Sequence, residues 1–251
     1  MPTTPPQPFH PALLLVDLQV DFSPPHGALP VSLAPDTIPH ILSLLSLPFP
    51  LKVFTQDTHP PNHISFAPNH PEPNNIPFTS YTTIIHPNDP SKSMQTRLWP
   101  VHCVRGTPGW QFLPGIKEWV ESHAQGDKVV IVEKGQDARV EMYSAFEDPF
   151  DGSICRGSPS LEDIFRDNGV TDVFVVGLAG DYCIKETVIH CGMKGFRTWV
   201  IQEGVASVDE GEVGWGEAKI SMERVADGTF VKVVGMEGQE VGWVRTLSNE
   251  T

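Results

Sequence analysis

Short, largely apolar runs rich in β-branched residues recur along the chain and constrain its fold more than any other feature. We predict strands at Ala12–Val16, Leu51–Thr55, Lys128–Val132, Asp172–Val176, Arg197–Ile201 and Thr229–Val234. Helical spacing of apolar residues predicts helices at Asp36–Leu47, at Ser160–Asn168 with Ser160 as its N-cap, and at Tyr182–Lys194. Apolar strands that alternate with helices are typical of a parallel sheet covered on both faces. We therefore expect an α/β fold, a three-layer sandwich with a mostly parallel central sheet flanked by helices.

The uneven distribution of proline does not divide the chain into domains. Strands in the first half need partners from the second half, so we expect residues 1–251 to form a single domain. Proline and asparagine punctuate the stretch from Pro60 to Pro90. This composition predicts a long ordered loop, and such loops often carry function.

Charge and composition exclude several classes of partner. The formal net charge is −14, which disfavours nucleic acid and anionic membrane surfaces. No apolar run approaches the roughly 20 residues of a membrane span, and residues 1–10 lack the pattern of a signal peptide. Four cysteines in 251 residues predict reduced thiols rather than a disulfide scaffold. We expect a cytoplasmic protein, with the nucleus and the peroxisome left open, and self-association is left open as well.

Reactive side chains follow several predicted strands, where open α/β sheets bind their ligands. Asp17 follows the first strand, Asp57 and His59 follow the second, and Lys134 and Cys183 follow the third and fourth. Each residue alone has an ordinary structural interpretation, because Asp is common in loops, Lys is mostly exposed and free Cys is mostly buried. Together they predict a reactive site at one edge of the sheet.

Cys183 is the candidate nucleophile. It lies near a predicted helix start, where unpaired N–H groups stabilise anions, and Lys134 would stabilise a thiolate further. We therefore expect a lowered thiol pKa, with Asp17 taking the proton and returning it to a leaving group. Cys191 is interpreted as structural, and Cys103 and Cys155 as structural or incidental.

A metal site is predicted from Asp57 and His59, whose side chains point the same way in an extended segment. His102 or His63 could supply a third ligand. A carboxylate with imidazoles and no thiolate suits Zn²⁺, with Fe²⁺ or Mn²⁺ as alternatives. We expect one divalent ion.

The chain resembles nicotinamidases, within the isochorismatase-like cysteine hydrolases. Five segments carry the resemblance in the family's order: Leu14–Phe22, Thr55–Pro60, Leu98–Cys103, Val132–Gly135 and Gly177–Cys183. The resemblance implies a catalytic triad of Asp17, Lys134 and Cys183, and a metal held by Asp57, His59 and His102. It also implies the isochorismatase-like hydrolase fold and a cis peptide between Leu178 and Ala179.

The resemblance further implies a substrate and its contacts. The implied reaction is hydrolysis of nicotinamide to nicotinate and ammonia through a thioester, in NAD salvage, with pyrazinamide-like analogues as further substrates. Phe22, Trp99 and Tyr143 are candidates for contact with the ring, although each is equally compatible with the core. Leu178 and Ala179 would lie beside the substrate, where backbone N–H groups receive the oxyanion.

Departures from the family pattern leave alternatives open. Val20 stands where relatives commonly have Asn, the segment near 136–159 is expected to form a lid insertion, and the extension near 235–251 has no predicted function. The alternatives are a hydrolase of the same family acting on another small amide, and an inactive binding protein of the same fold. A dithiol redox protein is excluded, because no two cysteines form a C-x-x-C pair.

Overall fold

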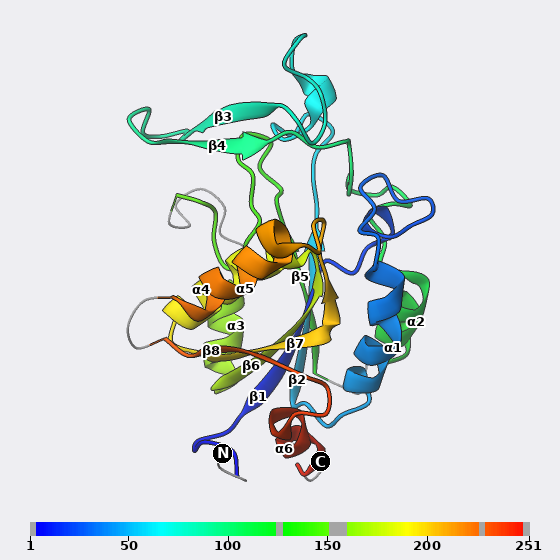
Figure 1. The fold of residues 1–251 in the computed structure, drawn as a ribbon, viewed down its shortest axis with the longest axis vertical. Helices are drawn as coiled ribbons and strands as arrows, with labels where there is room; N and C mark the ends of the chain where they lie inside the picture. The colour runs from blue at the N-terminus through cyan, green and yellow to red at the C-terminus, as the bar shows by residue number, and fades with distance from the viewer. Residues whose placement is uncertain (1–3, 124–127, 151–159, 226–228, 248–251) are drawn as a thin grey trace.

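Six parallel strands form the central sheet of the protein (Figure 1). The computed structural model describes residues 4–123, 128–150, 160–225 and 229–247. The strand order is β5-β2-β1-β6-β7-β8, and the strands are β1 (Pro11–Val16), β2 (Leu51–Asp57), β5 (Val129–Lys134), β6 (Asp172–Leu178), β7 (Arg197–Ala206) and β8 (Val231–Val234). Every predicted strand is present, and the predicted α/β fold with a parallel sheet is confirmed.

Helices cover both faces of this sheet (Figure 1). One layer contains α1 (Ala34–Leu45), α2 (Pro114–His123) and α6 (Gln239–Arg245), and the other contains α3 (Leu161–Asp167), α4 (Lys185–Met193) and α5 (Glu217–Glu223). Strand β1 is buried over its whole length. Leu13 and Leu15 pack into the first layer, whereas Leu14 and Val16 pack into the second. This alternation follows from the two-residue period of a strand, and it confirms the predicted three layers.

The N-terminus of α3 confirms the cap predicted from sequence. The Ser160 hydroxyl accepts a hydrogen bond from the Asp163 N–H, and the Asp163 carboxylate accepts one from the Ser160 N–H. This reciprocal pair satisfies two N–H groups that have no partner within the helix.

A β-hairpin replaces the end of the loop predicted at Pro60–Pro90. Strands β3 (Tyr81–Ile85) and β4 (Ser93–Arg97) pair antiparallel, and they lie beyond the main sheet in Figure 1. The loop prediction is wrong for residues 81–85, which form β3. The prolines and asparagines on either side of this short β-branched run favoured a loop in the sequence. Within the two strands only Ile84 and Thr96 are buried, so the hairpin gave little apolar signal.

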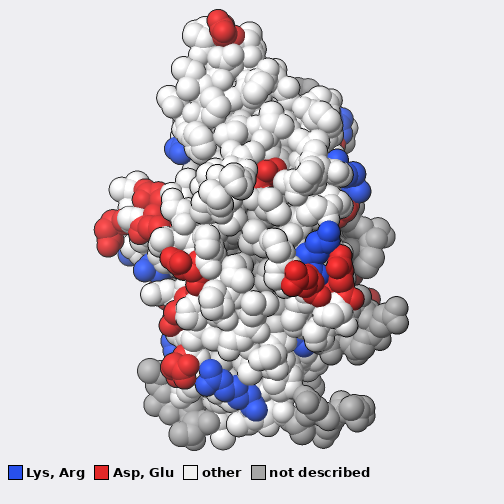
Figure 2. Space-filling model, turned by 90° about the vertical axis from the view of Figure 1, so that its right-hand side faces the viewer, with Lys and Arg blue, Asp and Glu red and all other residues white. Residues whose placement is uncertain are grey.

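Charge on the surface is mixed rather than segregated on the face that Figure 2 shows. Acidic and basic side chains are interspersed there, and no continuous basic patch is visible among the described residues. None of the helices in the described ranges is long and apolar enough to cross a membrane.

The C-terminal helix α6 packs against the sheet, although its sequence predicted no role. Trp243 is 6% exposed, and its ring lies edge-on to Phe9 and Trp199, at 6.0 Å and 5.7 Å between centroids. Aromatic pairs in this geometry stabilise a core beyond the area that they bury.

Replacing Trp243 with alanine should lower the free energy of unfolding by about 3 kcal/mol, because it leaves a large cavity beside the sheet. Denaturant unfolding measures the loss. Arg245→Ala on the same helix, which removes a partly exposed side chain, should change stability by less than about 0.5 kcal/mol. Equal effects of the two substitutions would contradict this account of α6.

Candidate active site

The strand ends bring the predicted reactive side chains to one edge of the sheet. Asp57 and Lys134 are directly paired across β2 and β5, while Asp17 follows β1 and Cys183 follows β6. All four are buried, and Cys183, at 8%, is the most exposed of them. The sheet therefore places two carboxylates, an ammonium and a thiol within one cluster.

Lys134 lies at the centre of this cluster. Its Nζ is 2.9 Å from Asp17 Oδ2 and 3.0 Å from Asp57 Oδ1, and it donates to Cys183 Sγ at 3.5 Å. Burial lowers the pKa of Lys134, but the two carboxylates outweigh burial and hold the pKa well above its usual value. Lys134 is therefore a fixed positive charge between the acid and the thiol.

Asp17 is a buried carboxylate with an altered proton affinity. Burial raises its pKa, and so does the charge of Asp57, whereas Lys134 and a hydrogen bond from Thr55 act in the opposite direction. Thr55 Oγ1 donates to Asp17 Oδ1 at 2.6 Å. The net result is a raised pKa, which suits a group that must both accept and return a proton.

Cys183 differs from the prediction in the direction of its pKa. It lies within a π-helical turn, Gly180–Ile184, that precedes α4. Burial raises its pKa well above the usual value, with Lys134 opposing and Asp17 and Asp57 reinforcing the shift. The prediction of a lowered pKa is wrong because desolvation of the thiolate outweighs the single neighbouring ammonium. The thiol therefore needs a base, and the Asp17 carboxylate, whose charge raises the pKa of the thiol, can supply one.

Asp57, His59 and His102 bring ligand atoms together beside Lys134. Asp57 Oδ2 is 2.9 Å from His59 Nε2 and 3.6 Å from His102 Nε2. The Nδ1 atoms of the two histidines contact the backbone carbonyls of Gly135 and Pro100, each at 2.8 Å. Nδ1 therefore carries the proton in each neutral ring, which leaves Nε2 free to bind a metal.

The electrostatics of these residues also fit a cation. His59 Nε2 is buried and, apart from its ion-pair contact with Asp57, has no hydrogen-bond partner among the described residues. Burial raises the pKa of Asp57, but His59 and Lys134 outweigh it and hold the pKa well below its usual range. Burial lowers the pKa of His59, but Asp57 outweighs it and raises the pKa to about 8. A proton and a metal ion would therefore compete for Nε2.

Gly135 allows His59 to approach this strand end. Its φ is +74°, and a Cβ at this position would lie 2.6 Å from the His59 ring. Only glycine combines this backbone conformation with such a close approach.

His63 lies near the metal-site residues with both ring nitrogens in contact with the protein. Nδ1 contacts Ser65 Oγ at 2.8 Å and Nε2 contacts the Val140 carbonyl at 3.1 Å. Its ring stacks on His59 with 4.0 Å between centroids, and burial lowers its pKa to about 4. Of the two histidines that the sequence left open as third ligands, His102 therefore has the freer nitrogen.

Glu141 is a site residue that sequence analysis missed. It is 4% exposed, and its carboxylate lies with His59 and His63 in a second group of potential metal ligands. Burial raises its pKa, but His63 and His59 outweigh burial and lower it. Glu141 follows no strand end, so the only signal in the sequence is one acidic residue between Val140 and Met142.

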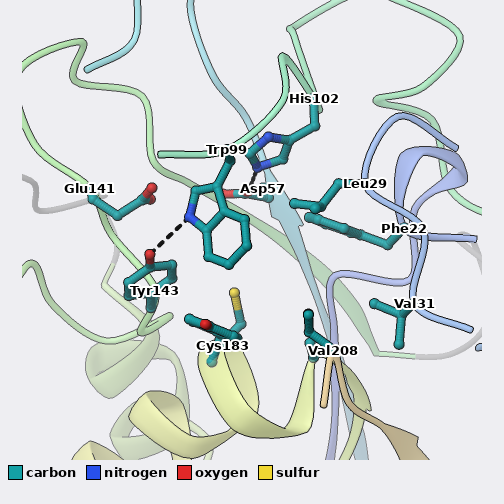
Figure 3. Close-up of a pocket in the computed structure, with 12 residues that line it drawn as sticks. Phe22, Leu29, Val31, Asp57, Trp99, His102, Glu141, Tyr143, Cys183 and Val208 are labelled. Carbon is teal, nitrogen blue, oxygen red and sulfur yellow. Dashed lines mark hydrogen bonds and ion pairs between the residues drawn. The ribbon is translucent and has the colours of Figure 1, made fainter. Parts of the chain in front are cut away.

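A largely apolar pocket opens above Cys183 (Figure 3). Phe22, Trp99, Tyr143 and Ala179, which were predicted to contact substrate, all line it. The pocket is also lined by four residues that were not predicted from the sequence: Leu29, Val31, Tyr182 and Val208. The Leu178 side chain is fully buried in the core and does not line this pocket, but its peptide bond to Ala179 is cis, as expected.

The polar edge of Trp99 is held by the protein rather than left for a ligand. Its Nε1 donates to the Tyr143 hydroxyl at 3.0 Å (Figure 3), and that hydroxyl also contacts Thr96 Oγ1 at 3.2 Å. Thr96 belongs to β4, so the hairpin supports the pocket wall. Trp99 also lines the pocket, and its aromatic surface suits contact with a flat aromatic ligand.

Known proteins are similar to this chain in sequence and in fold. A family model described as an isochorismatase domain matches residues 11–228. The chain belongs to the isochorismatase family. Among curated members, a nicotinamidase of Schizosaccharomyces pombe is 34% identical over 203 residues, covering 78% of this chain and 83% of the relative. A nicotinamidase of Saccharomyces cerevisiae is 35% identical over 193 residues, covering 75% of this chain and 84% of the relative.

Solved isochorismatase-family structures extend the comparison. A yeast nicotinamidase bound to the inhibitor nicotinaldehyde superposes with a TM-score of 0.79 and 29% identity, covering 89% of this chain and 100% of that chain. A pyrazinamidase of Pyrococcus horikoshii in complex with zinc superposes with a TM-score of 0.61 and 28% identity. The match covers 90% of this chain and 99% of that chain. The protein is thus an isochorismatase-like hydrolase closely related to nicotinamidases.

The charges around Cys183 predict opposite effects of two substitutions on its thiol pKa. Asp17→Asn should lower the pKa, because it removes a negative charge beside the thiol, while Lys134→Met should raise it, because it removes a positive charge. The rate of iodoacetamide alkylation against pH, followed by mass spectrometry of the Cys183 peptide, measures both shifts.

Cys191 supplies an internal control in the same digests. Burial raises its pKa to about 12, and neither substitution should change its labelling. An alkylation midpoint of Cys183 that does not fall in Asp17→Asn would show that burial alone sets the thiol pKa.

Proposed function

We propose that the protein is a metal-dependent cysteine amidohydrolase that converts nicotinamide to nicotinate and ammonia, a reaction of NAD salvage. The observation that carries the proposal is the convergence of Asp17, Lys134 and Cys183 at one end of an apolar pocket. The nicotinamidases among the relatives support the choice of substrate. A yeast relative that binds nicotinaldehyde supports a pyridine ring in the pocket.

In the first half of the reaction Cys183 would become acylated. Asp17 takes the thiol proton as Sγ attacks the carbonyl carbon, and backbone N–H groups near Ala179 and Cys183 receive the oxyanion. The C–N bond then breaks, and Asp17 gives its proton to the departing ammonia. Lys134 stabilises the negative charge on Asp17 and sulfur throughout.

In the second half a water molecule would hydrolyse the thioester. Asp17, now ionised, accepts a proton from the water as the water oxygen attacks the acyl carbon. The C–S bond breaks, the sulfur recovers a proton from Asp17, and the carboxylic acid product leaves and loses its own proton to solvent, which gives nicotinate. Asp17 and Cys183 thereby return to their starting protonation states.

We propose Asp57, His59 and His102 as the ligands of one divalent metal ion, zinc first, with iron or manganese as alternatives. Their converging ligand atoms support this assignment, as does the zinc in the Pyrococcus horikoshii relative. When bound, the ion supplies a Lewis acid that can coordinate the ring nitrogen of the substrate. Phe22, Trp99 and Tyr143 would orient the ring, and they line the pocket.

We also propose that residues 1–251 form one domain in which the segment near 136–159 acts as a lid. Glu141 and Tyr143, which line the pocket, come from its first part, which supports this role. Residues 151–159, with Cys155, lie outside the described residues, as do residues 248–251 of the C-terminal extension. A cytoplasmic location remains a prediction.

Purified protein should release ammonia from nicotinamide, and Cys183→Ala should lower kcat/KM by at least about 10³-fold because the nucleophile is lost. Cys191→Ala is the matched control, since Cys191 is also buried but does not line the pocket. Activity of Cys183→Ala at the wild-type level would overturn the proposed mechanism.

The metal assignment predicts different zinc contents for two histidine variants. His102→Ala should lose most bound zinc, whereas His63→Gln should keep about one equivalent, because the protein already occupies both nitrogens of His63. Elemental analysis after dialysis measures the content. Loss of zinc from His63→Gln with retention in His102→Ala would reverse the assignment.

A second candidate function is hydrolysis of a different small amide. The pocket walls are largely apolar, and such walls reject closely similar rings only weakly. A relative from Mycobacterium tuberculosis is described as a nicotinamidase/pyrazinamidase. Comparing kcat/KM for nicotinamide, pyrazinamide and benzamide tests this, and a ranking with nicotinamide last would favour the second function.

A further inference from the structure

The side chain of Gln19 is buried and clamps the backbone of Asp57. Its Nε2 donates to the Asp57 carbonyl at 2.8 Å, and its Oε1 accepts from the Asp57 N–H, also at 2.8 Å. Gln19 has no solvent exposure. A primary amide is the neutral side chain that offers a donor and an acceptor in this side-by-side arrangement. The residue type is therefore matched to the peptide groups of Asp57.

Gln19 is itself held firmly in place. The second proton of Nε2 donates to the Trp110 carbonyl at 2.9 Å, and the backbone N–H of Gln19 donates to the Asp17 carbonyl at 2.8 Å. The side-chain amide of Gln19 therefore makes three hydrogen bonds, all to backbone groups of the protein. The clamp joins the loop that carries Asp17 to the end of β2, which carries Asp57.

The carboxylate of Asp57 has two tasks that require a fixed orientation. Oδ1 contacts Lys134 Nζ at 3.0 Å, and Oδ2 faces His59 Nε2 at 2.9 Å. A change in the backbone at Asp57 would move both oxygens together, because the side chain has only two rotatable bonds. The position of the Asp57 backbone therefore controls the ligand geometry on one side and the contact with Lys134 on the other.

We propose that Gln19 is a positioning residue that fixes Asp57 for metal binding and for its contact with Lys134. The inference rests on the proposed function, in which Asp57 is a metal ligand. Removal of the amide leaves the Asp57 N–H and carbonyl buried without their partners, which favours local rearrangement. Loss of such an outer contact of a metal ligand typically weakens metal binding by about 10- to 100-fold.

Gln56 offers a matched control for the substitution. It precedes Asp57, is 5% exposed, and donates from Nε2 to the same Trp110 carbonyl at 2.8 Å. In the described part of the chain its amide makes no hydrogen bond to Asp57. Gln19→Met and Gln56→Met therefore remove the same chemical group and the same Trp110 contact, but only Gln19→Met releases Asp57.

The zinc dissociation constant of each full-length variant, measured by competition with a chromophoric chelator, tests the proposal. Gln19→Met should bind zinc about 10- to 100-fold more weakly than the wild type, and Gln56→Met should stay within about threefold. Thermal unfolding of the metal-free proteins reports separately on any loss of stability. Wild-type affinity in Gln19→Met, or equal weakening in both variants, would leave Gln19 with a structural role only and overturn the proposal.

Gln19→Asn covers the case in which Gln19→Met does not fold. It keeps the amide but is one methylene too short to span both groups of Asp57, so it should weaken zinc binding in the same direction. Unchanged affinity in Gln19→Asn would also overturn the proposal. If the wild type itself binds no zinc, the proposed metal site fails together with this inference. Ammonia release from nicotinamide then reports independently on the proposed activity.

Discussion

The buried ammonium of Lys134 is the interaction on which the site depends. It lies within 3.0 Å of carboxylate oxygens of both Asp17 and Asp57. Two carboxylates so near each other and away from water would repel strongly, and each would tend to become neutral. One cation between two anions leaves a net negative charge, which lies on the side of His59 and His102. A second cation at that position would complete the balance of charge.

The parallel sheet explains how this cluster can exist without flexible segments. Each strand ends at the same edge, so residues at the ends of β2 and β5 meet residues that follow β1 and β6 there. Two buried contacts then connect neighbouring strand ends at the same sequence separation, Thr55 with Asp17 and Gln19 with Asp57. These contacts hold Asp17, the proposed proton acceptor, and Asp57, which faces the histidines, in fixed positions relative to each other.

Sequence patterns predicted the strands well but several site properties poorly. Apolar runs identify buried strands because burial itself selects those residues, and the end of each run located Asp17 and Lys134. The hairpin β3–β4 was not predicted, because its strands are mostly exposed and lie among prolines. Glu141 was not predicted as a site residue, because it lies in a segment without helix or strand. The direction of the Cys183 pKa shift was wrong because desolvation depends on burial, which a sequence does not display.

The sequence by itself determined the layered α/β architecture, the order of the strand-end residues and the types of chemical group available to the site. These follow from periodicity and from residue chemistry, which are local properties. Only the tertiary structure decided which nitrogen of each histidine is free, how deeply the thiol is buried, and which amide holds Asp57. Those properties arise from contacts between residues far apart in the chain, and their energies depend on distance and on exclusion of water.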